Sequence, residues 1–357
     1  MNHSITRRLG TVLLWCAACN HPAPPGPGDY TPGGPNGSGS PLQLTYNFGV
    51  DLTPGWFPDG HAFLYSEERV DRPDRDRCLA QLPAAGGSIT REICDRVPAA
   101  DDSVDSYTWP AIQRDGRVAY VRATAWLGAG WPISPRFHEL VLAPLADPLD
   151  TRVLVTIPYI GPSGRGHDEA THIRWLGDSA LIYVGEAVHY IPPCRGCAPD
   201  TVSSGQELVR LDFRTPVPVL TMLPASDQAS SVDVVGTDSV YFTVNGDTKV
   251  YRLTLSTDSV AVVHDFSSAG IARDVQVRGH RLFAIVGGSV SFVLDSVYGP
   301  LQRDFGGSLV AVDLNTDAET LMSALPLRHV AVAPDGAHAV AELVSGKTTD
   351  LYLVDLP

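Results

Sequence analysis

The stretch GWFPDG at residues 55–60, followed by HAFLYS at 61–66, decides the fold of this chain. Its Asp-Gly pair supplies the positive φ that a tight hairpin turn requires, and the flanking apolar residues alternate as two strands would. Five later segments repeat this pattern of strand, turn and strand. The turn glycines of the six segments are Gly60, Gly116, Gly177, Gly236, Gly279 and Gly336.

Each repeat continues with a third strand, such as 139–142 or 309–314, and usually with a fourth, such as 152–157. Four strands in each unit are typical of a propeller blade, and no window of about twelve residues has helical periodicity. The sequence therefore predicts an all-β, six-bladed β-propeller of four-stranded antiparallel blades over residues 42–357.

The two ends of the repeat region predict how the ring closes. The last unit has only three strands before Pro357, whereas residues 42–48 form a strand with no unit of their own. We expect this N-terminal strand to pair as the outer strand of the last blade, because that pairing removes an exposed sheet edge.

The segments WFPDG at 56–60 and VAPDG at 332–336 resemble the W-S-P-D-G turn of TolB-type β-propellers. The resemblance extends over essentially all of 42–357, although only the first and last units keep the fuller signature. It implies the propeller fold and a role as an interaction module in the bacterial cell envelope.

Residues 1–19 have the pattern of a secretory signal, with Arg7 and Arg8 before an apolar stretch that is too short to span a bilayer. The following Cys16-Ala17-Ala18-Cys19 resembles the lipobox of bacterial lipoproteins, which implies that Cys19 carries the lipid. The sequence departs from that pattern at Cys16, where leucine is usual. An ordinary cleaved signal with an incidental cysteine is the alternative.

Residues 20–41 predict a disordered tether, because 13 of these 22 positions are Pro or Gly. Asn20 is not the Asp that resembles an inner-membrane retention signal, so we expect a lipid anchor in the outer membrane, facing the periplasm. The extracellular surface is the alternative location. Apart from this anchor we expect no contact with the membrane.

The charge balance excludes one class of partner. The chain has 40 acidic and 26 basic residues, a net charge of −14, and lacks the basic footprint that nucleic acids require. It has no G-x-S-x-G, no phosphate-binding G-x-x-x-x-G-K-[ST] and no H-E-x-x-H motif. We therefore expect a monomer without a cofactor and predict no catalytic residue.

The connections between second and third strands fall on one face of a propeller, and four of them are long: 67–77, 123–137, 186–205 and 288–307. We predict structureless insertions there, and such loops on a rigid scaffold often bind partners. Aromatic residues on these loops suit a protein or peptide of the cell envelope, unless the loops pack them onto the blades. The candidates are Trp126, Trp131, Phe137, Tyr190, Phe292 and Tyr298.

Four cysteines follow the signal region, an even number for an oxidising compartment. Cys78 and Cys94 flank a predicted hairpin centred on Gly86, which places them opposite each other and predicts a disulfide. Cys194 and Cys197 have a spacing that also occurs in redox and zinc sites, but a local disulfide that pins the loop is the better interpretation.

The densest group of histidines and carboxylates precedes the first strand of the third unit: His167, Asp168, Glu169 and His172. We predict no metal site, because this group lacks a recognised ligand spacing and is better explained as a polar connection. These four residues are nevertheless the candidates for an alternative function. That alternative is a propeller hydrolase or lyase that acts at the channel mouth, with or without a metal.

Overall fold

The computed structural model describes residues 41–45, 50–68, 77–94, 103–126, 135–157, 159–160, 165–191, 200–223, 226–295, 299–304, 306–345 and 348–357. All labelled elements are β-strands. Within these ranges, no helix has the length and apolar character needed to cross a membrane. The predicted signal with Cys19 and nearly all of the tether lie outside the described residues, as do Trp131, Tyr298, Cys194 and Cys197.

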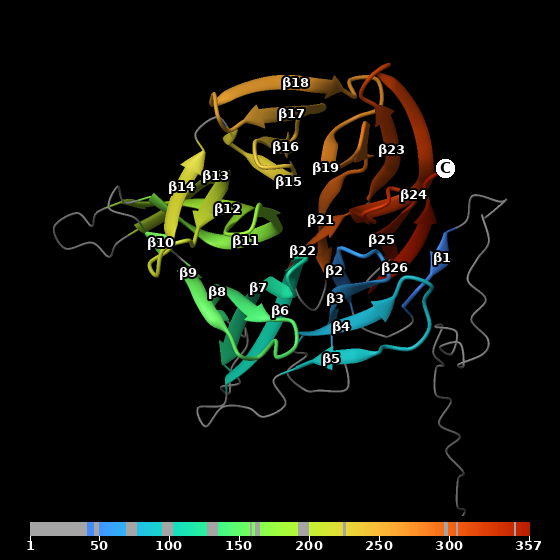
Figure 1. Cartoon of the computed structure of the whole chain (residues 1–357). Helices are drawn as coiled ribbons and strands as arrows, with labels where there is room; N and C mark the ends of the chain where they lie inside the picture. The colour runs from blue at the N-terminus through green and yellow to red at the C-terminus, as the bar shows by residue number, and fades with distance from the viewer. Residues whose placement is uncertain are drawn as a thin grey trace, which may run out of the picture.

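The strands form antiparallel sheets arranged in a ring around a common centre (Figure 1). The first four-stranded sheet is β2 (Asp51–Trp56), β3 (Ala62–Glu68), β4 (Arg77–Pro83) and β5 (Arg91–Ile93). The second is β6 (Ser103–Ile112), β7 (Arg117–Trp126), β8 (Pro135–Pro144) and β9 (Arg152–Ile157). The third is β11 (Arg165–Leu176), β12 (Ala180–Ile191), β13 (Asp200–Asp212) and β14 (Val219–Leu223), with β10 (Tyr159–Ile160) added beside β11. The fourth is β15 (Ala229–Val235), β16 (Ser239–Val244), β17 (Lys249–Thr254) and β18 (Ser259–Asp265).

A seven-stranded sheet completes the ring, and its long strand β24 explains why two units appear as one. Its strands are β1 (Leu42–Gln43), β19 (Ala272–Arg278), β20 (Arg281–Val286), β23 (Gly307–Asp313), β24 (Ala318–Val332), β25 (His338–Ser345) and β26 (Thr348–Asp355). The first part of β24 pairs with β23 and its last part pairs with β25. It is thus the outer strand of one four-stranded group and the inner strand of the next, a pattern consistent with the six predicted units.

The predicted pairing of the N-terminal strand with the last strand is confirmed. Leu42 lies opposite Leu353, and the Leu44 N–H donates to the Leu351 carbonyl over 2.8 Å. The strand itself covers only Leu42–Gln43 of the expected 42–48. Leu44 is buried with side chains of the first sheet and of β25 and β26, so this contact joins the two ends of the ring.

The turn glycines have the predicted positive φ, and turn aspartates stabilise three of the hairpins. All six turn glycines have positive φ, between 62° and 82°. The carboxylates of Asp59, Asp115 and Asp335 each accept a hydrogen bond from the backbone N–H two residues later. Such Asx turns stabilise the hairpin.

The prediction of structureless insertions is wrong for three long connections, because the strands themselves extend into them. β7 and β8 remain paired up to Ala125 and Pro135. β12 and β13 remain paired up to Ile191 and Asp200. Strands β21 (Val290–Asp295) and β22 (Gly299–Asp304) form a separate hairpin. This side of the ring therefore carries β-hairpins, and we call it the hairpin side; the opposite side, with the six glycine turns, is the turn side.

The core consists of apolar clusters between neighbouring sheets. One cluster joins Ala119 of the second sheet to Leu181 of the third, and another joins Phe63 of the first sheet to Val340 of the last. Each sheet therefore buries both faces, which explains the nearly continuous apolar runs of the second strands, such as RLFAIV at 281–286. Burial on both sides holds the inner strands rigidly, and their channel-facing side chains are fixed with them.

Candidate functional site

Two layers of side chains lie on the inner strands at the centre of the ring. Strand register places the members of each layer at equivalent positions, and the two layers are two residues apart, so they share one side of each strand. The hairpin-side layer is Thr53, Trp109, His172, Ser231, Asp274 and His329. The turn-side layer is Gly55, Ala111, Arg174, Asp233, Gln276 and Ala331.

Every inner strand has a register irregularity beside the hairpin-side layer. At three positions the bulge coincides with a positive φ on a residue other than glycine: 52° at Thr53, 55° at Trp109 and 51° at His172. Bulges re-aim side chains, and left-handed backbone at bulky residues costs free energy. The fold thus directs these side chains toward the centre at some cost in stability.

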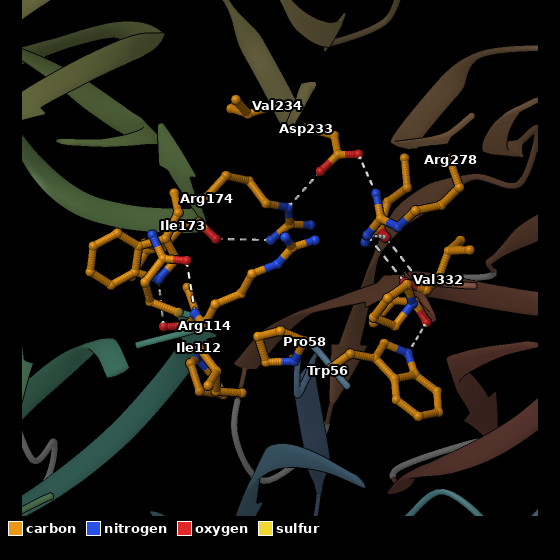
Figure 2. A pocket seen from close by; sticks show the side chains of 18 of the residues that line it. Trp56, Pro58, Ile112, Arg114, Ile173, Arg174, Asp233, Val234, Arg278 and Val332 are labelled. Atoms are coloured by element: carbon orange, nitrogen blue, oxygen red, sulfur yellow. Dashed lines mark hydrogen bonds and ion pairs between the residues drawn. The ribbon is translucent and has the colours of Figure 1, made fainter. Parts of the chain in front are cut away.

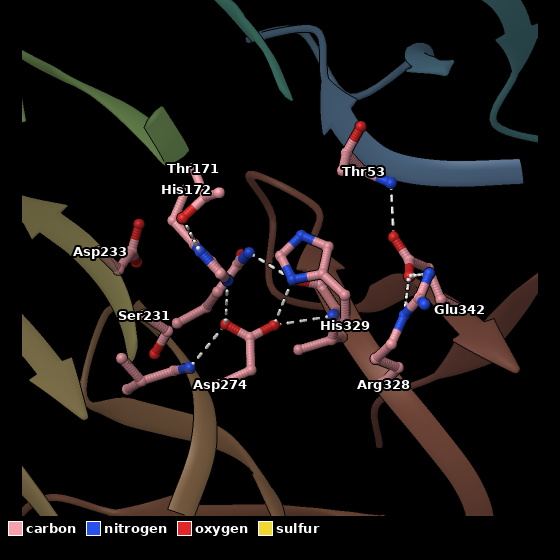
Figure 3. A network of polar contacts seen from close by, with 12 residues as sticks. Thr53, Thr171, His172, Ser231, Asp233, Asp274, Arg328, His329 and Glu342 are labelled. Carbon is pink, nitrogen blue, oxygen red and sulfur yellow. Dashed lines mark hydrogen bonds and ion pairs between the residues drawn. The ribbon is translucent and has the colours of Figure 1, made fainter. Parts of the chain in front are cut away.

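His172, Asp274 and His329 come together from three different units (Figure 3). The His329 Nδ1 lies 2.6 Å from Asp274 Oδ2, and the His172 Nε2 lies 3.8 Å from Asp274 Oδ1. All three side chains are largely buried, with exposed fractions of 13% for His172, 5% for His329 and 1% for Asp274. The cluster is therefore a set of converging polar groups inside the ring.

Asp274 is fixed by the backbone around it. The Val275 N–H donates to Oδ1 over 2.8 Å, and the Val330 N–H donates to Oδ2 over 2.9 Å. Burial alone would raise the pKa of Asp274, but the neighbouring His329 and His172 and the Val330 N–H outweigh it and lower the pKa to about 2. Asp274 is consequently a carboxylate at neutral pH.

The histidines are packed against an aromatic wall. The Trp109 ring centre lies 4.2 Å from that of His172 and 5.0 Å from that of His329. Burial is the main cause that lowers the pKa of His172, to about 3, so its imidazole is neutral at neutral pH. A neutral imidazole can accept a proton or donate a lone pair to a metal.

A second buried carboxylate neighbours this cluster on the hairpin side. Glu342 accepts from Arg328 Nη2 over 2.9 Å and from Arg328 Nε over 3.0 Å, and it also accepts from the Thr53 N–H. Both arginine nitrogens donate to Oε2 and the Thr53 N–H donates to Oε1, so Glu342 joins β24 and β25 to β2 across the closure of the ring.

A cavity of about 450 Å³ opens on the hairpin side above these groups. Its lining includes Trp109, His172 and His329 of the layer, together with the side chains Arg77, His138, Arg273, Arg328 and Glu342. Arg77 and His138 come from the start of β4 and from β8, close to the paired hairpins. The cavity is thus at the base of the surface for which the sequence predicted a binding role.

The turn side has a different cavity, of about 570 Å³, lined by all six members of the turn-side layer. Figure 2 shows Asp233 between Arg174 and Arg278. Its carboxylate lies 3.2 Å from Arg174 Nε and 2.9 Å from Arg278 Nη1, and it also accepts the Val277 N–H over 2.8 Å. These contacts satisfy the carboxylate within the protein.

The predicted disulfide between Cys78 and Cys94 is present, with a Cα–Cα distance of 4.8 Å. Glu92 lies beside it, but the oxidised sulfurs are not thiolate ligands for a metal. For the aromatic candidates Trp126, Phe137, Tyr190 and Phe292, the structure describes the strand and not the side chain. Their predicted role in binding therefore stays a prediction.

The predicted group of four histidines and carboxylates lies within strand β11, not before it. The side chains of His167, Asp168 and Glu169 are outside the described part of the structure. His172 is brought together with Asp274 and His329, two residues that the sequence analysis did not select. A signal for them existed, because the three residues occupy equivalent positions in the repeat.

In sequence, the chain matches no protein-family model and no curated protein. In structure, it is similar to a gluconolactonase from Xanthomonas campestris, with a TM-score of 0.55 and 12% identity over 96% of this chain and 99% of that one. It is also similar to TolB from Acinetobacter baumannii, with a TM-score of 0.52 and 13% identity over 83% of this chain, spanning only 64% of that protein. A putative TolB from Agrobacterium tumefaciens gives a TM-score of 0.52 and 14% identity over 88% of this chain and 93% of that one.

These similarities support the propeller fold and include the TolB-type proteins that the turn motifs resemble. The same fold carries both an enzyme and TolB proteins in these examples, at identities far too low to transfer an activity. The function of this chain therefore depends on its own side chains.

Proposed function

We propose that this chain is a six-bladed, lipid-anchored propeller of the cell envelope that binds a protein or peptide on its hairpin side. The observation that carries the proposal is the hairpin-side cavity, which lies at the base of the paired hairpins β7–β8 and β12–β13. A peptide segment could enter the cavity while the predicted aromatic residues of the hairpins contact the surrounding surface. Large aromatic contacts with a central pocket are typical of peptide and protein recognition.

The charge of the cavity indicates what such a segment would carry. Arg77 and Arg273 line it beside the pair of Arg328 and Glu342. Arginine is well suited to bind carboxylates through paired hydrogen bonds. An acidic side chain or a C-terminal carboxylate is therefore the group we expect to enter.

Crosslinking in cells tests this binding. A photoreactive residue at position 126 should capture a defined envelope protein, and the capture should disappear in the variant Trp131→Ala, Phe137→Ala. The matched control is a photoreactive residue at Arg114, on the turn side. Equal capture at both positions, or capture that survives the double substitution, would contradict a specific surface on the hairpin side.

The anchor is tested separately through Cys19. Wild-type protein should incorporate a labelled fatty acid and sediment with the outer membrane, whereas Cys19→Ala should stay unlabelled and lose its membrane association. Labelling that persists in Cys19→Ala would move the lipid to another residue. An unlabelled wild type that is soluble in the periplasm would favour the ordinary secretory signal.

A second candidate function is a hydrolase or lyase that acts at the hairpin-side mouth. The cluster of His172, Asp274 and His329 favours it, because imidazoles beside a buried carboxylate can transfer protons or hold a metal. Such an enzyme should turn over at least one substrate in a panel of esters, lactones and acidic oligosaccharides and should lose that activity in His172→Ala. A binding module should tolerate His172→Ala and be inactive with the whole panel.

A further inference from the structure

We infer that His172, Asp274 and His329 bind one divalent transition-metal ion on the hairpin side of the channel. The three residues come from β11, β19 and β24 and converge from separate units (Figure 3). The site would exist whether the hairpin side binds a peptide or a substrate, so it does not depend on the proposed function.

The spacing of the ligand atoms fits a single ion. Ligands about 2.0–2.2 Å from a tetrahedral zinc lie roughly 3.3–3.6 Å from one another. Here the two nitrogen-to-carboxylate distances are 2.6 Å and 3.8 Å, and all three ligand atoms lie within 4.8 Å of one another. Shifts of a few tenths of an ångström to about one ångström would bring them to the distances of a metal site.

The orientation of His329 provides an independent observation. Its Nδ1 is buried and in ion-pair contact with Asp274 Oδ2 at 2.6 Å, but it makes no hydrogen bond within the part of the chain that the structure describes. A buried polar atom without a partner is costly. A metal between the two groups would use the nitrogen lone pair and remove that cost.

Charge compensation points in the same direction. Asp274 is 1% exposed, and a buried carboxylate requires a neighbouring positive charge. Asp233, at the turn side, has two arginines for this purpose, whereas the cluster of Asp274 has two histidines. A divalent cation would place a fixed positive charge beside Asp274, as the two arginines do beside Asp233.

The ligand types select the class of metal. Two imidazole nitrogens and one carboxylate oxygen suit Zn²⁺, Fe²⁺, Co²⁺ or Mn²⁺, whereas Ca²⁺ requires six to eight oxygen ligands. Asp274 is already oriented by the Val275 and Val330 N–H groups, as the ligands of metal sites usually are. Three protein ligands leave at least one coordination position free, and both histidines line the hairpin-side cavity.

Titration of the full chain with metal tests the inference. The protein is purified with an affinity handle that lacks histidine, stripped with a chelator, and titrated with Co²⁺ and Zn²⁺ by calorimetry and visible absorption. We expect one equivalent of Co²⁺ with the absorption bands of a nitrogen- and oxygen-ligated ion. His172→Asn and His329→Asn should each weaken binding by about 100-fold or more, beyond the loss typical of outer-shell partners.

His338→Asn is the matched control, since His338 lies in the same unit as His329 but is exposed on the turn side. It should bind Co²⁺ as the wild type does, and circular dichroism should show that all three variants are folded. Unchanged affinity in His172→Asn and His329→Asn would place the bound metal elsewhere and overturn the inference. Failure of the stripped wild type to bind either metal would also overturn it and leave His329 as a charged partner of Asp274. Neither result would affect crosslinking at the hairpins, which tests the proposed function on its own.

Discussion

Asp233 and Asp274 are two buried carboxylates in neighbouring units of the same ring, with exposed fractions of 2% and 1%. Asp233, in the turn-side layer, contacts Arg174 and Arg278, which are cations at any physiological pH. Asp274, in the hairpin-side layer, faces His172 and His329 instead. The same fold thus surrounds one buried carboxylate with arginines and the other with histidines.

The difference separates a structural site from a responsive one. Arginines satisfy Asp233 permanently, and its position between three elements of the channel makes it a structural crosslink. Asp274 faces two imidazoles, which can bind either a proton or a metal, so the environment can change the state of that site. Functional chemistry is therefore expected on the hairpin side and rigidity on the turn side.

The largest expected effect concerns stability without metal. Asp233→Asn keeps the shape of the side chain but leaves Arg174 and Arg278 without their counter-charge, so we expect a loss of about 3 kcal/mol in the free energy of unfolding. Asp274→Asn should cost less, about 2 kcal/mol in the stripped protein, because the amide can accept only one of the two backbone N–H groups that Asp274 accepts, whereas its side-chain neighbours are not permanent cations. Denaturant unfolding of both variants in the presence of a chelator measures the two losses. An equal or larger loss for Asp274→Asn would mean that the two sites are equally structural.

Metal binding should have the next largest effect on stability. With metal present, Asp274→Asn should become the less stable of the two variants relative to the wild type. At 100 times the dissociation constant, a ligand that binds only the folded state stabilises it by about 2.7 kcal/mol. We expect Zn²⁺ to stabilise the wild type and Asp233→Asn by this amount and to leave Asp274→Asn unchanged. Thermal unfolding with and without Zn²⁺ measures the gain. Stabilisation of all three proteins alike would show that the ion binds outside the hairpin-side layer.

The fold was predictable because its determinants are local and repeat. A turn glycine needs positive φ, and all six predicted turn glycines have it. The disulfide was predictable for the same reason, since the hairpin centred on Gly86 fixes Cys78 opposite Cys94. The extended hairpins were missed because the composition of 123–137 and 186–205 resembles that of loops, whereas strand pairing is set by the partner strand.

The site was only partly predictable because its residues are far apart in sequence. His172 stood out through its local neighbours His167, Asp168 and Glu169, which are not the residues it meets in the cluster. The useful signal was the offset from the turn glycine: His172 and Asp274 lie five residues before theirs, and His329 lies seven before its own. The offset of His329 is larger because the Asp-Gly turn of the last unit is longer. The strand register is therefore needed to recognise that the three residues are at equivalent positions.

The smallest effect is expected at Ser231, which occupies the hairpin-side layer between the units of His172 and Asp274. Its hydroxyl lies 2.7 Å from the Thr243 hydroxyl, which has a second partner in Ser230 at 2.8 Å. Ser231→Ala should therefore cost about 1 kcal/mol or less and leave Co²⁺ binding unchanged, as unfolding and calorimetry can show. Weaker Co²⁺ binding in Ser231→Ala would extend the metal site beyond the two histidines and Asp274. In that case metal binding would be a property of the whole hairpin-side layer, and the turn-side layer with Asp233 would differ from it as a layer.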